Sequence, residues 1–291
     1  MDWSNIEQAI SAAEEIDFNV SSSRPIGGGS INSAYLIENP KHQYFVKLNS
    51  AKYADMFSAE AEGLAEIHKP NVIKVPRPIC YGNQAGSAYI VLEYIPFGRG
   101  DNTSPLKLGK QLANLHRVTN NNFGWFRDNT IGSTSQNNTL SSNWIDFYRE
   151  FRLEYQIKLA VDQGHNGQLK KLGTKICDNL EDYFSGYDPQ PSLLHGDLWS
   201  GNYDYDRFGD PIIFDPAVYF GDREADMAMT ELFGGFSPNF YDAYNEAYPL
   251  DEGYEVRKNL YNLYHILNHL NLFGGGYYSQ SVSMMQRLLS V

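Results

Sequence analysis

The first third of the chain alternates between apolar and polar residues in a way that predicts strands packed with two helices. Apolar residues at helical spacing predict a helix over 2–16, and a second one over 56–67. Residues 21–29 are rich in Ser, Pro and Gly, so we expect a loop there. Short apolar runs predict strands over 33–36, 43–48 and 88–94.

The rest of the chain has mainly helical periodicity, interrupted by a short β region around 193–215. The segment 96–100, Pro-Phe-Gly-Arg-Gly, is the best candidate for a hinge. We therefore expect an N-terminal lobe over 1–95 and a C-terminal lobe over 96–291, an α+β, bilobal arrangement like that of protein kinases. Helices are expected over 105–118, 142–162, 166–185, 224–233, 237–247 and 253–273.

Composition and charge narrow the possible partners. With 23 basic and 35 acidic residues among 291, the formal net charge is −12, which argues against nucleic acid and suits a cationic substrate such as an amine. We expect no membrane span and no signal peptide, because no stretch is long and apolar enough and the start lacks the signal pattern. The two distant cysteines, Cys80 and Cys177, indicate a reducing cytoplasm.

The strongest chemical pattern is residues 193–202, Leu-Leu-His-Gly-Asp-Leu-Trp-Ser-Gly-Asn. Asp197 and Asn202 are five positions apart, the spacing of the kinase loop in which an aspartate orients the acceptor hydroxyl and an asparagine binds Mg²⁺. A bare His-Gly-Asp turn would be the simpler explanation if nothing else matched. However, Asp215 follows the apolar run 212–214, where kinases place a second Mg²⁺ ligand.

The strand 44–48 contains a lysine, and a buried lysine needs an acidic partner. Glu60 on the following helix is the natural partner of Lys47, and Glu62 is the competing candidate. This pairing would match the strand-lysine and helix-glutamate pair of kinases. A lysine that extends its ammonium to water from an edge strand is the alternative.

Two other segments are expected to bind ATP. The end of the strand 88–94 lies where kinases bond adenine, so backbone groups of Glu93 and Ile95 are candidates, on position alone. Glycines before the lysine strand would let backbone N–H groups approach phosphates, although a flexible hairpin would look the same. The residues expected in this phosphate loop are Gly27, Gly28, Gly29 and Ser30.

The whole chain resembles the fructosamine kinase (ketosamine-3-kinase) family, which is related to aminoglycoside and choline kinases. The resemblance rests on the His-Gly-Asp-Leu loop and on the stretches 123–136, 219–226 and 232–236. It implies ATP and Mg²⁺ as cofactors and phosphorylation of the 3-hydroxyl of a ketose joined to an amine, which leads to deglycation. Several members carry a cysteine where this chain has Ser30, so no redox switch is expected in that loop.

Some residues have two open interpretations. Trp199 could pack on the sugar or anchor its loop, and Gln136 could bond sugar hydroxyls or order its own loop, as could Asn138. Asp226 and His195 are expected to brace the catalytic loop rather than to react. Two other functions also remain open: a kinase of a different small molecule, or a nucleotide-binding pseudokinase that serves as a scaffold.

Overall fold

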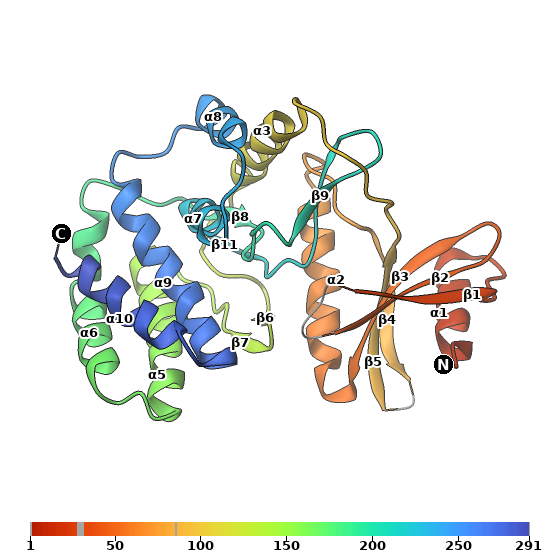
Figure 1. The fold of residues 1–291 in the computed structure, drawn as a ribbon, viewed down its shortest axis with the longest axis horizontal. Helices are drawn as coiled ribbons and strands as arrows, with labels where there is room; N and C mark the ends of the chain where they lie inside the picture. Colours follow the sequence, from red (N-terminus) through yellow and green to blue (C-terminus); the bar gives the residue numbers. More distant parts are fainter. Residues whose placement is uncertain (1, 28–31, 85, 291) are drawn as a thin grey trace.

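The N-terminal part of the protein is a five-stranded antiparallel sheet in the order β1–β2–β3–β5–β4, the right-hand part of Figure 1. The computed structural model describes residues 2–27, 32–84 and 86–290. The strands are β1 (Ser22–Ile26), β2 (Ser33–Glu38), β3 (Gln43–Ser50), β4 (Pro78–Gln84) and β5 (Ser87–Glu93).

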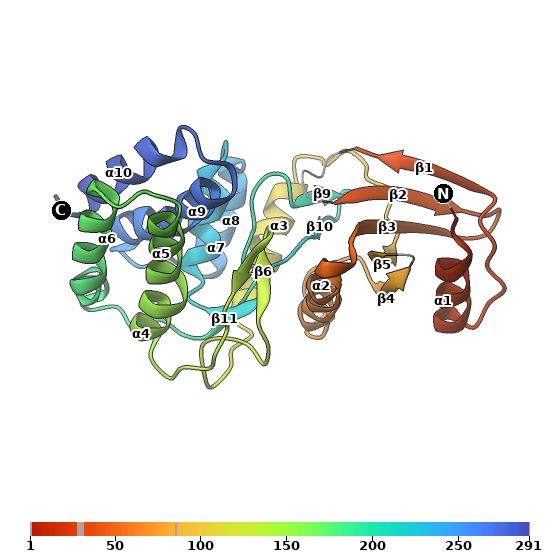
Figure 2. The same cartoon turned by 90° about the horizontal axis from the view of Figure 1, so that it is seen from below.

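Helices α1 (Ser4–Glu14) and α2 (Ala54–His68) cover opposite faces of this sheet. The side chains of β5 alternate between two clusters, because successive residues of a strand point to opposite faces. Figure 2 shows the two helices on either side of β4 and β5. Ala88, Ile90 and Leu92 share a cluster with α2, whereas Tyr89 and Val91 share one with α1.

Strands β1 and β4 were not predicted, and the prediction of a loop over 21–29 was wrong where β1 forms. Both strands lie at the edges of the sheet, where a strand pairs on one side only. Four of the five β1 residues are exposed, so the strand has no apolar alternation to reveal it. Pro25 and Pro78 fit there because an edge strand tolerates the missing N–H of proline.

The remaining part of the chain is mainly helical and forms the left-hand lobe of Figure 1. The predicted helix over 142–162 is one helical run, in which the π-helical turn Arg149–Glu154 separates two α-helical pieces. α10 was not predicted. The α-helices are α3 (Ser104–His116), α4 (Trp144–Tyr148), α5 (Tyr155–Asp162), α6 (Gln168–Asp178), α7 (Glu224–Leu232), α8 (Pro238–Ala247), α9 (Tyr254–Phe273) and α10 (Tyr277–Leu288), with 3₁₀ turns at Ala51–Tyr53 and Leu180–Phe184.

Three small antiparallel pairs lie between the sheet and the helices. β8 leads into the loop that carries Asp197, and β10 leads to Asp215. The β9–β10 hairpin also reaches the N-terminal part, since the Ile213 N–H donates to the Lys74 carbonyl at 3.0 Å. The pairs are β6 (Asn129–Ile131) with β7 (Thr134–Gln136), β8 (Ser192–Leu194) with β11 (Tyr219–Gly221), and β9 (Tyr203–Tyr205) with β10 (Pro211–Ile213).

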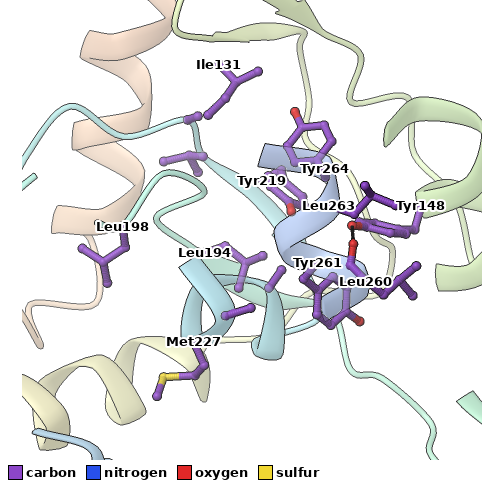
Figure 3. Close-up of a cluster of buried hydrophobic side chains, with 14 of the residues drawn as sticks. Ile131, Tyr148, Leu194, Leu198, Tyr219, Met227, Leu260, Tyr261, Leu263 and Tyr264 are labelled. Atoms are coloured by element: carbon purple, nitrogen blue, oxygen red, sulfur yellow. Dashed lines mark hydrogen bonds between the residues drawn. The ribbon is translucent and has the colours of Figure 1, made fainter. Parts of the chain in front are cut away.

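A large apolar core lies beneath the loop after β8. Leu194 and Leu198 are fully buried on either side of the loop's Gly-Asp pair, among residues of α7, α9 and β11 (Figure 3). The Tyr148 hydroxyl donates to the Leu260 carbonyl at 3.1 Å and so ties α4 to α9. Among the described residues, none of the helices combines the length and the apolar character that crossing a membrane requires.

The contact between α3 and α8 gives a stability prediction. A Cβ added to Gly109 would stand 2.4 Å from the Phe240 carbonyl oxygen, which is rigid helix backbone. Although alanine favours a helix over glycine, Gly109→Ala should lower the free energy of unfolding by about 1–3 kcal/mol because the helices must separate. Thermal and urea unfolding measure this.

Gly173→Ala in α6 is the matched control, because its Cβ would meet the flexible end of Ile157 at 2.7 Å. The Ile157 side chain can rotate away, so Gly173→Ala should be the milder change. Equal losses of stability in the two variants would contradict the backbone-contact explanation for Gly109.

Candidate active site

Two adjoining clefts meet at the junction of the sheet and the helical lobe, and they share Asn32, Lys47, Trp199, Asn202 and Asp215. We call them the sheet-side cleft and the hairpin-side cleft. The sheet-side cleft is also lined by Arg24, Gly27, Phe45, Leu92, Glu93, Ile95, Phe97 and Phe214, among others. The hairpin-side cleft is also lined by Met56, Ala59, Glu60, Asn129, Thr130, Gly132, Asp197, Pro216 and Ala217.

An ion triad of Lys47, Glu60 and Asp215 borders the clefts: Lys47 and Asp215 line both of them, and Glu60 lines the hairpin-side cleft. The Lys47 ammonium lies 2.6 Å from Glu60 Oε1 and 2.5 Å from Asp215 Oδ1. Burial disfavours the charged lysine, but the two carboxylates outweigh it and raise the pKa of Lys47. The predicted pairing of Lys47 with Glu60 is therefore confirmed, whereas Glu62 pairs with Arg127 at 3.0 Å.

Asp197 and Asn202 face each other across the tight loop after β8. The Asn202 amide donates to the Asp197 carbonyl at 2.8 Å and to its carboxylate Oδ2 at 3.2 Å. Burial and the negative charge of Asp215 raise the pKa of Asp197 well above its ordinary value. Asp197 lines the hairpin-side cleft but not the sheet-side cleft. The Asp197 carboxylate thus lies on one side of the ion triad.

The loop before Asp197 is held from below by Asp226. This buried carboxylate accepts the backbone N–H of His195 at 2.7 Å and that of Gly196 at 2.8 Å, and its Oδ2 also lies 3.2 Å from His116 Nε2. The interpretation of Asp226 as a brace is therefore confirmed. Because both carboxylate oxygens are engaged with the loop or its support, Asp226 is a structural residue.

His195 connects the two segments that carry Asp197 and Asp215. Its Nδ1 accepts the Asp197 N–H at 3.2 Å, so Nε2 must carry the ring proton and donate to the Phe214 carbonyl at 3.0 Å. The ring is then neutral, in agreement with burial, which lowers the pKa of His195. The interpretation of His195 as a brace is also confirmed.

Gly196 explains why this loop cannot carry the arginine of protein kinases. Its φ is +82°, and a Cβ would stand 2.1 Å from the Ala217 carbonyl oxygen. The loop and the segment after Asp215 approach so closely because the Ala217 N–H donates to the His195 carbonyl at 2.8 Å. Asp215 itself has a φ of +58°, a strained conformation of the kind that clusters at functional sites.

The prediction that Gln136 binds substrate is wrong. Its side chain is 1% exposed and lies behind the cleft wall. Its amide donates to Asn129 Oδ1 at 2.8 Å and to the Ala217 carbonyl at 3.2 Å, and it accepts from the Tyr264 hydroxyl at 2.8 Å. Gln136 orders its own hairpin, and Asn138 is equally buried. The hairpin residues in the cleft wall are instead Asn129, Thr130 and Gly132.

Arg152 supports the same hairpin, and sequence reasoning missed it. Its side chain is fully buried in the π-helical turn and donates to the Asn137 carbonyl at 2.6 Å and to Asn138 Oδ1 at 2.7 Å. The guanidinium also lies 4.3 Å from the ring centroid of Tyr219. No carboxylate of the described chain pairs with it. Arg149 lies in the same helical run, so no local signal singles out Arg152.

The sheet-side cleft holds the other residues proposed from the sequence. Gly27, Glu93 and Ile95 line it, whereas Gly28, Gly29 and Ser30 lie outside the described residues. The Glu93 N–H already donates to the Arg77 carbonyl at 2.8 Å, so the carbonyl is the Glu93 backbone group left for a ligand. Sequence reasoning missed Phe97 and Phe214, which both line this cleft and whose rings stack on each other with centroids 5.4 Å apart.

The oxygens near the triad fit a magnesium ion. Asp215 keeps its second carboxylate oxygen, and its side chain is 45% exposed. Because the Asn202 amide nitrogen points at Asp197, the amide oxygen remains for a cation. One carboxylate and one amide suit Mg²⁺, which usually binds few protein ligands together with substrate phosphates.

Neither cysteine of the chain lines the two clefts, and both thiols are at least partly shielded from solvent. Cys80 is half-buried in β4 and Cys177 is buried in α6. Burial raises the pKa of each thiol to about 12.

The fold belongs to a known class of kinases. The crystal structure of a choline kinase from Streptococcus pneumoniae matches with a TM-score of 0.59 over 99% of this chain and 97% of that one, at 17% identity. At that identity the match shows a common fold. The protein therefore has the bilobal, protein-kinase-like α+β fold of the small-molecule kinases, as predicted.

Closer relatives identify the family of the protein within this fold class. The family model described as fructosamine kinase matches residues 2–291. A Synechocystis protein named a probable ketoamine kinase is 45% identical over 99% of this chain and 97% of its own length. A chloroplastic protein-ribulosamine 3-kinase of Arabidopsis thaliana is 44% identical over 91% and 81%. A Haemophilus somnus crystal structure, provisionally described as a fructosamine-3-kinase, matches with a TM-score of 0.91 at 32% identity, over 99% and 97%. The chain belongs to the fructosamine kinase family, and it is a kinase.

The close approach at Gly196 predicts a loss of both activity and stability. Gly196→Ala places a methyl group against the Ala217 carbonyl, so the loop must separate from the segment that carries Asp215. Gly186→Ala is the control, since its φ is also positive, at +77°, but its Cβ would meet nothing within 4 Å. Kinase activity and thermal unfolding of both variants measure the difference. Similar behaviour would mean that backbone strain alone, and not the contact, matters.

Proposed function

We propose that this protein transfers the γ-phosphoryl group of ATP to the 3-hydroxyl of ketosamines, in a step that leads to deglycation. The observation that carries this proposal is the division of the site. Lys47, Asn202 and Asp215 border both clefts, whereas Asp197 borders only the hairpin-side cleft. ATP in the sheet-side cleft and a sugar in the hairpin-side cleft would meet between these groups, in agreement with the family.

The nucleotide would lie against the N-terminal lobe, which we place at residues 1–95, with 96–291 as the lobe that binds the acceptor. Backbone groups of Glu93 and Ile95 would bond adenine in the sheet-side cleft. Lys47, positioned by Glu60, would bind phosphate oxygens, next to the loop that begins at Gly27. Asn202 and Asp215 would hold Mg²⁺, which would supply positive charge to offset that of the phosphates.

Asp197 would orient the acceptor and accept its proton. The 3-hydroxyl oxygen attacks the γ-phosphorus, the bond from that phosphorus to the bridging oxygen of ADP breaks, and ADP leaves with the bonding electrons. The hydroxyl proton passes to the Asp197 carboxylate. The raised pKa of Asp197 suits a proton acceptor, and its hydrogen bond from Asn202 fixes its orientation. Trp199 would pack against the sugar ring.

The names of the relatives support a ketosamine rather than another small molecule, since the two most similar curated proteins quoted above are a ketoamine kinase and a ribulosamine 3-kinase by name. The intact ion triad and the Asp197 loop argue against a pseudokinase scaffold. The cytoplasm remains our proposal for its location.

A direct assay tests the proposed function. Fructosamine or ribulosamine adducts of lysine should stimulate consumption of ATP in the presence of Mg²⁺, and the product should carry phosphate on the third carbon of the sugar. Choline and aminoglycosides are the comparison substrates. Turnover with those compounds alone, or phosphate on the amine carrier, would overturn the ketosamine assignment.

A second prediction separates the roles of the two aspartates. Asp197→Asn should reduce kcat about 10²–10⁴-fold while nucleotide binding stays near normal, because the carboxylate acts mainly in the transition state. Asp215→Asn should weaken metal and nucleotide binding together, because an anionic ligand is lost. Excess Mg²⁺ should therefore partly restore the activity of Asp215→Asn but not that of Asp197→Asn. Kinetics and nucleotide affinity across a Mg²⁺ series measure this, and restoration of Asp197→Asn would reverse the assignment.

A further inference from the structure

A continuous row of aromatic rings leads away from the catalytic loop. Trp199 contacts Phe233 with ring centroids 6.1 Å apart, and Phe233 contacts His269 at 4.8 Å. His269 in turn contacts Phe273 at 5.6 Å and Tyr277 at 5.2 Å. We call these five residues the aromatic strip. It connects the loop that carries Asp197 to the corner between α9 and α10.

The two ends of the strip are open to solvent. Trp199 is 37% exposed and Phe273 is 56% exposed, and the other three rings of the strip are half-buried. Contiguous apolar surface of this kind marks a binding site more often than scattered exposed rings do.

The aromatic strip carries no charged side chain. None of its five residues is acidic or permanently basic, and burial lowers the pKa of His269, so that ring is neutral at pH 7. The strip is also fixed to the catalytic loop, because the Ser200 hydroxyl donates to the Phe233 carbonyl at 3.3 Å. A rigid, uncharged surface of this kind fits a neutral apolar or aromatic group.

The chemistry of a ketosamine places such a group at the strip. The nitrogen is bonded to the first carbon of the sugar and the reacting hydroxyl to the third, so only two carbon–carbon bonds separate the two carbons. When the hydroxyl reaches Asp197, the nitrogen and its carrier must lie close to the same loop. Trp199 lies two residues after Asp197, lines the hairpin-side cleft and begins the strip.

We propose that the aromatic strip binds the carrier of the amine, and that the enzyme prefers ketosamines whose nitrogen bears an apolar or aromatic group. This proposal rests on the proposed function and adds to it the class of amine. The sugar occupies the hairpin-side cleft, and the first apolar atoms of the carrier lie over Phe233 and His269, with Phe273 at the outer end.

The test compares two carriers on wild-type enzyme and two variants. The substrates are the fructosamines of benzylamine and of methylamine, and the measured quantity is the ratio of their kcat/KM values. Wild-type enzyme should favour the benzylamine adduct about tenfold, as expected for partial burial of a phenyl ring. Phe273→Ala should reduce this ratio several-fold. Phe208→Ala, a 70%-exposed phenylalanine outside the strip, should keep the wild-type ratio.

The outcomes distinguish the two proposals. Turnover of both adducts at equal kcat/KM, or equal ratios in Phe273→Ala and Phe208→Ala, would overturn the assignment of the strip and leave the proposed function standing. Absence of turnover with every ketosamine would overturn the proposed function itself. Sedimentation gives one further outcome: a wild-type dimer that Phe273→Ala dissociates would assign the strip to a second copy of the chain instead of the carrier.

Discussion

The contact of one buried ammonium with two carboxylates determines most of the geometry of this site. Lys47 comes from β3, Glu60 from α2 and Asp215 from the segment after β10, so the ion triad joins the sheet, its helix and the helical lobe. A buried lysine without these partners would be strongly unfavourable, and each carboxylate would repel the other without the lysine. Each member therefore holds the other two, and Asp215 keeps its left-handed backbone conformation within this arrangement.

The hairpin-side cleft depends instead on hydrogen bonds between single charged side chains and neutral amide groups. Asp226 holds the backbone of the loop, and Leu198 anchors it in the core beneath. The opposite wall, the β6–β7 hairpin, is held by buried amides and by Arg152. Amides and carbonyls with fixed partners leave little freedom for the residues they carry, so Asp197 and the hairpin face each other across a cleft of defined width.

The residues whose chemistry is local could be predicted from the sequence, and those in long-range networks could not. The five-residue spacing of Asp197 and Asn202 and the lysine within an apolar strand are local signals, and the predicted Lys47–Glu60 pair follows from the cost of burying a lone charge. Gln136 was a candidate for sugar binding because a side-chain amide can bond either a sugar hydroxyl or neighbouring protein groups. Only the folded structure shows which partners it has. The exposed edge strand β1 has no alternation of apolar residues. The polar partners of Arg152 come from another part of the chain, so no local pattern marks it.

The burial of the two cysteines has a consequence for chemical durability. Peroxides react with the thiolate, and burial raises the pKa of each thiol to about 12, so both cysteines are almost entirely protonated at neutral pH. Cys80 and Cys177 are therefore poor targets for oxidants, and neither lies in the clefts. The candidate site itself contains carboxylates and an ammonium, and those groups do not change with the redox state of their surroundings.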